Sequence, residues 1–122
     1  MSDIGRILVA DDEDTFLQAT ADLLRKKGYE CNCASDAKTV TEMLRSTKYD
    51  LLITDINIPG NKDLELIKDL QNSPKVIPVI LMTGEPFLLP AIQSVKPPVV
   101  ACLIKPFDFN ELLEHVKISI GR

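Results

Sequence analysis

The chain reads Leu51-Leu52-Ile53-Thr54-Asp55-Ile56-Asn57-Ile58-Pro59-Gly60 near its middle, and this stretch decides the fold. Its first four residues have the character of a buried strand, and the Pro-Gly pair is a stop signal. Asp55 therefore stands where the strand ends. In open parallel α/β sheets, ligands bind outside the carboxyl ends of the strands. Asp55 is thus a candidate reactive residue; the alternative is that it only begins a loop, since aspartate is a common turn residue.

Length and composition predict one domain over residues 1–122. Hydrophobic residues make up 45% of the chain and charged residues 26%, as in soluble proteins that bury a core. The formal net charge of −4 argues against binding of nucleic acid, so we expect protein or small-molecule partners. No segment approaches the roughly 18 apolar residues of a membrane span. We expect a cytoplasmic protein without membrane contact, and Met1, just before the first apolar run, favours a natural start.

Outward from the central stretch, short apolar runs alternate with helical patterns. The predicted strands cover residues 6–10, 29–34, 51–54, 78–82 and 99–104. The predicted helices cover residues 14–27, 36–46, 64–70, 88–96 and 108–120, the fourth being kept short by its prolines. Regular alternation of this kind implies a parallel sheet with right-handed crossovers and helices on both faces. The sequence therefore predicts an α/β fold with a doubly wound, five-stranded parallel sheet.

Helical spacing also predicts which side chains face the core. The first helix has an apolar face at Phe16, Leu17, Ala21, Leu23 and Leu24, and the last helix has one at Leu112, Leu113 and Val116.

Three cysteines are a small and odd number, which does not suit a disulfide framework. Cys31 and Cys33 would share one face of a strand. A Cys-x-Cys pair can bind a metal, but no second Cys or His pair stands at a useful spacing, which favours small buried hydrophobic residues. His115 is expected on the exposed flank of the last helix, and the absence of a second histidine argues against a phosphoryl relay.

Four of the five predicted strands end in a polar residue. These residues are Asp11 and Asp12, then Asp55, Thr83 and Lys105. In a parallel sheet they would lie along one edge. Taken singly, each has an ordinary explanation: a helix cap for either of the first two acids, a turn for the threonine and a solvated charge for the lysine. Their joint placement is harder to explain by packing alone.

This set of residues resembles the receiver domain of response regulators in two-component signalling, in particular the single receivers of chemotaxis. The resemblance covers nearly the whole chain: an acidic pair, an aspartate before a proline turn, a threonine, and Lys105-Pro106. It implies a flavodoxin-like sheet with strand order 2-1-3-4-5. It also implies that a histidine kinase or phosphotransfer protein supplies a phosphoryl group to Asp55, and that binding of a downstream protein then changes. Beyond self-phosphorylation and autodephosphorylation, no enzymatic turnover is expected.

The resemblance also implies a Mg²⁺ site. Asp11, Asp12 and Asp55 would repel one another when close together, so their ionisation calls for a cation among them. A hard divalent ion with oxygen ligands meets that need. By the resemblance, Asp12, Asp55 and the backbone carbonyl of Asn57 bind it directly, and Asp11 binds it through water.

Two further roles follow from the same resemblance. Thr83 would turn its hydroxyl to a phosphoryl oxygen, and Lys105 would neutralise charge on the transferring group. The bond before Pro106 would be cis.

The sequence departs from the family pattern at two positions. Cys102 stands where receivers usually carry an aromatic residue whose inward swing reports phosphorylation, so the output face is atypical. Asp63 replaces the usual glycine before the third helix.

Two other functions remain open on the sequence. The first is a receiver-like scaffold that works through protein contacts without phosphorylation. The second is a phosphatase with an aspartate nucleophile, because Asp12-Glu13-Asp14 resembles the start of haloacid-dehalogenase-type enzymes. That reading would leave Asp55 without a role.

Overall fold

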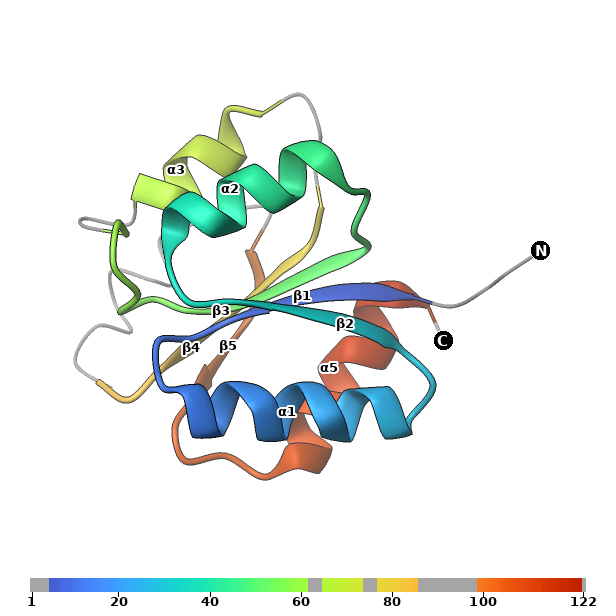
Figure 1. Ribbon diagram of the computed structural model, residues 1–122. Helices are drawn as coiled ribbons and strands as arrows, with labels where there is room; N and C mark the ends of the chain where they lie inside the picture. The colour runs from blue at the N-terminus through green and yellow to red at the C-terminus, as the bar shows by residue number, and fades with distance from the viewer. Residues whose placement is uncertain (1–4, 62–64, 74–76, 86–98, 122) are drawn as a thin grey trace.

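The computed structural model describes residues 5–61, 65–73, 77–85 and 99–121 (Figure 1). The described strands are β1 (Arg6–Ala10), β2 (Glu30–Ala34), β3 (Leu51–Asp55), β4 (Val79–Thr83) and β5 (Val99–Ile104). The described helices are α1 (Asp14–Lys26), α2 (Ala37–Ser46), α3 (Glu65–Gln71) and α5 (Phe109–Ile120).

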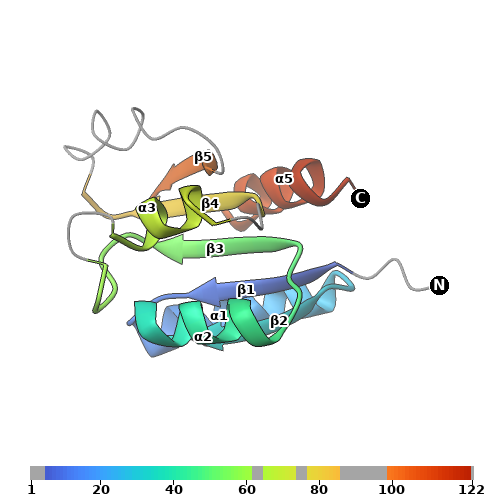
Figure 2. The same cartoon turned by 90° about the horizontal axis from the view of Figure 1, so that it is seen from above.

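The five strands form one parallel sheet in the order β2-β1-β3-β4-β5 (Figure 2). Asp55, the last residue of β3, is paired in register with Met82 of β4. The predicted doubly wound fold and its strand order are therefore confirmed. Because all strands run the same way, their carboxyl ends meet at one edge of the sheet.

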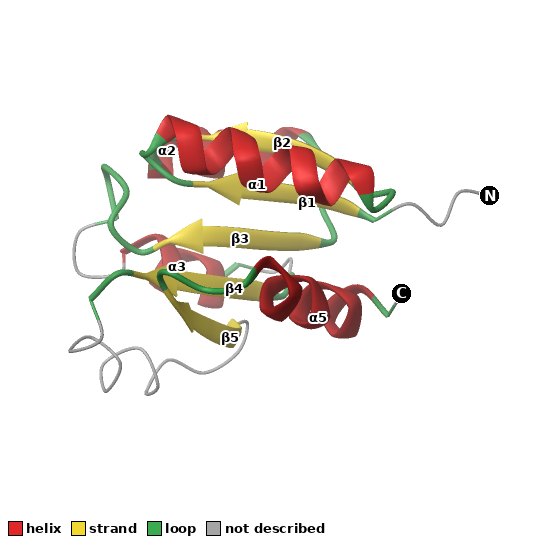
Figure 3. Cartoon of the chain, turned by 90° about the horizontal axis from the view of Figure 1, so that it is seen from below, coloured by secondary structure: helices red, strands yellow, loops and turns green. Residues whose placement is uncertain are grey.

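Helices cover both faces of the sheet. α1 and α5 lie on one face, and α2 and α3 lie on the other (Figures 1 and 3). Successive strand residues alternate between the two cores: Ile7 packs with α1 and α5, whereas Leu8 packs with α2 and α3. Both side chains are fully buried. Helices thus pack on both faces of the sheet, and the two cores hold the strands in position.

The helix termini follow the predicted signals. Asp36 is the N-cap of α2, and its carboxylate accepts a hydrogen bond of 2.7 Å from the amide of Thr39. Asp108 caps α5 in the same way through the amide of Asn110. Gly28, beyond the end of α1, has a φ of 97°, a backbone conformation that favours glycine.

One predicted core position is wrong. Leu23 is 40% exposed, while Leu17, Ala21 and Leu24 are buried as predicted. Leu23 lies directly before Leu24 on a helix of 3.6 residues per turn, so the two point about 100° apart. Thr20 takes a buried position instead. In α5 the three predicted core residues are all buried.

Cys31 and Cys33 pack on the same core cluster and are free thiols, as is Cys102. Burial raises the pKa of Cys31 to about 12, which suits a small buried hydrophobic residue.

The predicted helix over residues 88–96 and the departure at Asp63 lie outside the described residues. Within those residues, none of the helices combines the length and the apolar character that crossing a membrane requires.

Candidate functional site

The centre of the candidate site is a lysine between two aspartates. The ammonium of Lys105, which follows β5, donates hydrogen bonds of 2.6 Å to the Oδ2 atoms of Asp11 and Asp55. Asp11 follows β1 and Asp55 ends β3, the adjacent strand. The sheet therefore brings together three of the residues that the sequence analysis selected, although they are up to 94 positions apart in the chain.

Each of the two carboxylates is oriented by its own loop. Oδ1 of Asp11 accepts a hydrogen bond of 2.9 Å from the amide of Glu13, and Oδ1 of Asp55 accepts one of 2.8 Å from the amide of Asn57. One oxygen of each carboxylate is thus held by the backbone, while the other faces Lys105. This arrangement fixes the direction of both acids before any ligand arrives.

The charged groups of Asp11, Asp55 and Lys105 are largely shielded from water. The side chain of Asp11 is fully buried, and those of Asp55 and Lys105 are 10% and 18% exposed. Burial by itself lowers the pKa of Lys105, but the hydrogen bonds and charges of Asp11 and Asp55 outweigh it, so the pKa is raised. Lys105 is therefore the cation that compensates the paired acids.

Thr83, at the end of β4, and Asn57, which follows β3, both form hydrogen bonds with Glu85. Thr83 is fully buried, and its Oγ1 accepts a hydrogen bond of 2.9 Å from the amide of Glu85. The side-chain amide of Asn57 donates to the carboxylate of Glu85. The carbonyl of Thr83 also accepts a hydrogen bond of 2.7 Å from the amide of Lys105. These contacts connect the ends of β3, β4 and β5.

Asp12 does not join this compact group. It is exposed, and among the described residues no three His, Cys, Asp or Glu side chains are gathered as a metal-binding cluster. The donor chemistry still fits a hard divalent ion, because Asp11 and Asp55 present paired carboxylate oxygens at one edge and Asp12 follows directly. These oxygen donors at the ends of β1 and β3 could therefore hold Mg²⁺.

Sequence reasoning missed two contacts at this edge. The ring of Phe16, predicted only as a core position, lies with its centroid 4.2 Å from the ammonium of Lys105. Asn61 was not selected at all, yet it is buried and its side chain bridges the carbonyl of Ile56 and the amide of Leu66. Only its position one residue after Pro59-Gly60, where a turn residue is common, was a signal.

Cys102 is half-buried on β5 and packs against the core on the side of α2 and α3. The bond between Lys105 and Pro106 is cis, as the resemblance implied.

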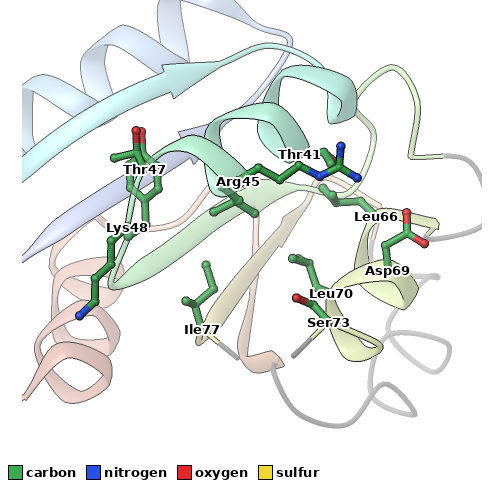
Figure 4. A pocket seen from close by; sticks show the side chains of 11 residues that line it. Thr41, Arg45, Thr47, Lys48, Leu66, Asp69, Leu70, Ser73 and Ile77 are labelled. Carbon is green, nitrogen blue, oxygen red and sulfur yellow. The ribbon is translucent and has the colours of Figure 1, made fainter. Parts of the chain in front are cut away.

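A separate pocket of about 800 Å³ lies between α2 and α3 (Figure 4). Its walls are largely apolar, with Leu66 and Leu70 from α3, and Arg45 of α2 and Asp69 of α3 supply charges. None of the residues at the carboxylate edge lines it. Among the residues that line the pocket, Asp69 is the one acid, so the pocket does not share the paired carboxylates of the strand ends.

Comparisons with known proteins show the family to which the chain belongs. The response regulator receiver domain family matches residues 7–117. The Escherichia coli regulatory protein AtoC is 30% identical over 112 residues, which cover 92% of this chain and 24% of AtoC. The E. coli transcriptional regulator NtrC is 30% identical over 117 residues, covering 96% of this chain and 25% of NtrC. The chain thus spans about a quarter of the length of these relatives.

Solved structures of receiver domains and response regulators are also similar to this chain. A CheY-like receiver domain from Methanospirillum hungatei has a TM-score of 0.87 and 26% identity, covering 97% of this chain and 94% of its own. The Thermotoga maritima response regulator TrrA, in complex with Mg²⁺-BeF, has a TM-score of 0.84 and 31% identity, covering 95% of this chain and 99% of its own. The family match extends over residues 7–117, most of this chain, and the chain therefore belongs to the response regulator receiver domain family.

Proposed function

We propose that Asp55 accepts a phosphoryl group from a histidine kinase or phosphotransfer protein, and that the modified protein changes its affinity for a downstream protein. The observation that carries this proposal is the Lys105 ammonium, 2.6 Å from a carboxylate oxygen of both Asp55 and Asp11. A cation held beside an oriented carboxylate suits a reaction in which negative charge arrives on a nucleophile.

The transfer would be a displacement at phosphorus. A carboxylate oxygen of Asp55 forms the new P–O bond, the bond from phosphorus to the donor breaks, and the leaving group takes its electron pair. Asp12, Asp55 and the carbonyl of Asn57 would hold Mg²⁺, with Asp11 acting through water. When bound, the ion neutralises charge on the acids and on the phosphoryl group.

Lys105 and Thr83 would then bind the phosphoryl oxygens. The lysine ammonium carries three N–H donors, so it can exchange a carboxylate partner for a phosphoryl oxygen. The Thr83 hydroxyl accepts a hydrogen bond from the Glu85 amide and donates only a long one, of 3.5 Å, to the Glu85 carbonyl, so its proton can turn to a phosphoryl oxygen.

A second candidate function is a receiver-like scaffold that binds partners without phosphorylation. Cys102 favours it, because this small side chain on β5 replaces the aromatic residue that the resemblance leads one to expect. The oriented acids and Lys105 oppose it, since a pure scaffold has no use for buried charges. Nothing at this edge favours the phosphatase alternative, which would leave Asp55, paired with Lys105, without a role.

We further propose that the protein works in the cytoplasm as a signalling phosphoacceptor and does not turn over a metabolite. AtoC and NtrC are regulators of which this chain spans about a quarter, so their output functions are not carried over. Binding of nucleic acid is not part of the proposed role of residues 1–122.

The test is covalent phosphoryl uptake from acetyl phosphate, measured by intact mass with Mg²⁺ and with chelator. Wild-type protein should gain one phosphoryl group only with Mg²⁺, and Asp55→Asn should gain none. Asp69→Asn, which makes the same change at an exposed position of α3, should behave as the wild type. Equal uptake by Asp55→Asn would contradict the proposal. Absence of uptake from acetyl phosphate and from a panel of phosphorylated histidine kinases would favour the scaffold.

A further inference from the structure

The Lys105 ammonium has a third neighbour besides the two carboxylates. The Phe16 ring on α1 lies with its centroid 4.2 Å from Nζ, well inside the roughly 6 Å within which a cation is attracted to an aromatic face. The side chain of Lys105 is 18% exposed, so the contact forms where little water competes. The lysine is therefore held by one residue from each of three elements: the ends of β1 and β3, and α1.

The ring of Phe16 is itself held in place. Phe107 meets it edge-on, with the ring centroids 6.0 Å apart and the planes at 89°, a favoured arrangement for aromatic pairs. Phe107 follows Lys105 by two positions, so the same loop that carries the lysine also supports the ring. Both phenylalanines are partly buried against the core under α1 and α5. The ring face is thus presented to the ammonium by packing.

An aromatic face suits this position better than a third acid would. It attracts the ammonium through its quadrupole but carries no net charge, so it does not repel an incoming phosphoryl group. In the proposed transfer Lys105 exchanges a carboxylate for a phosphoryl oxygen, and the contact with Phe16 can persist through that exchange. The ring would keep the ammonium at the reacting edge while its anionic partners change.

We infer that Phe16 is a positioning residue, which holds the Lys105 ammonium in place for phosphoryl transfer to Asp55. This inference rests on the proposed function, because it assigns the ring a task in that reaction. It predicts that loss of the aromatic face slows the transfer even where the core remains packed.

The decisive variants are Phe16→Leu and Phe16→Met, which keep an apolar side chain without a ring face, and Phe16→Tyr, which keeps the face. We expect the maximal rate of phosphoryl uptake from acetyl phosphate to fall roughly two- to fivefold in the first two, as loss of a cation–π contact would cause. Phe16→Tyr should retain the wild-type rate. Phe109→Leu is the matched control, since Phe109 packs on the same core and has no part in the proposed contact.

A second readout does not depend on the reaction. In the wild type and in Phe16→Tyr, ring current should move the NMR signals of the Lys105 Cε protons upfield, whereas both aliphatic variants should lose this shift. The inference is overturned if the aliphatic variants keep the wild-type rate, or if Phe109→Leu slows uptake equally. Absence of uptake by the wild type from any phosphodonor would instead overturn the proposed function, and the inference with it. The two failures are therefore distinguishable.

Discussion

At the scale of single residues, Lys105 is the charge on which the site depends. It is the cation between two buried or nearly buried carboxylates, and their mutual repulsion is uncompensated without it. Lys105→Met keeps a long apolar side chain but removes the ammonium. Since removing one partner leaves buried charges without their hydrogen bonds, the free energy of unfolding at pH 7 should fall by about 1 to 3 kcal/mol. Urea denaturation would measure the loss.

The pH dependence of that loss has a definite sign. The pKa of Lys105 is raised above its ordinary value of 10.5 in the folded protein. Its stabilising contribution is therefore complete below pH 10.5 and disappears as the pH rises through the folded value. The difference in stability between wild type and Lys105→Met should stay constant from pH 7 to 9 and narrow above about pH 10.5. A difference that widened at alkaline pH would contradict the assignment of Lys105 as the compensating cation.

At the scale of elements, the side chain of Asn61 connects the loop after β3 to the start of α3. Asn61 donates to the Ile56 carbonyl at 2.8 Å and accepts from the Leu66 amide at 2.9 Å. Ile56 lies between the proposed phosphoacceptor and Asn57, so this bridge also supports the site. Gly60 has a φ of 89°, and a Cβ at this position would come within 3.1 Å of the Ala37 Cβ, so the glycine lets the loop pass near α2.

Asn61→Ala should therefore weaken both the loop and the start of α3. Two buried backbone groups would lose their partners, and we expect the free energy of unfolding to fall by about 2 to 4 kcal/mol in urea denaturation. Asn61→Asp should also lower it, because the carboxylate still accepts from the Leu66 amide but cannot donate to Ile56, and a buried negative charge would face that carbonyl oxygen. If both variants unfold with the wild-type free energy, the Asn61 bridge contributes nothing to the loop.

The strand ends were predictable from sequence because the signal for each lies in a few consecutive residues. A buried apolar run stops at a polar residue, and parallel pairing then places Asp11, Asp55 and Lys105 at one edge. The contacts of Phe16 and Asn61 were not predictable, because helical or turn patterns give no partner across the fold. Leu23 was assigned to the core because apolar character alone does not distinguish adjacent positions on a helix.

At the scale of the whole molecule, the site is tied to global stability through the sheet. β3 is the central strand of the order β2-β1-β3-β4-β5, and all five of its residues are buried. Asp55 ends this strand, so its position depends on both cores. A ligand that binds at Asp55 in the folded state alone must therefore raise the free energy of unfolding of the entire domain.

Mg²⁺ should accordingly raise the melting temperature without any phosphodonor. At free Mg²⁺ ten times the dissociation constant, the gain is about 1.4 kcal/mol, which corresponds to a rise of about 5 °C for a domain of this size. Asp12→Asn and Asp55→Asn should reduce the rise, because each removes a proposed ligand, while Asp69→Asn should retain it. Calorimetry at matched ionic strength separates specific binding from screening. If Asp55→Asn melts with the same Mg²⁺ dependence as the wild type, the ion does not bind at the ends of β1 and β3, and the proposed role of these acids must be given up.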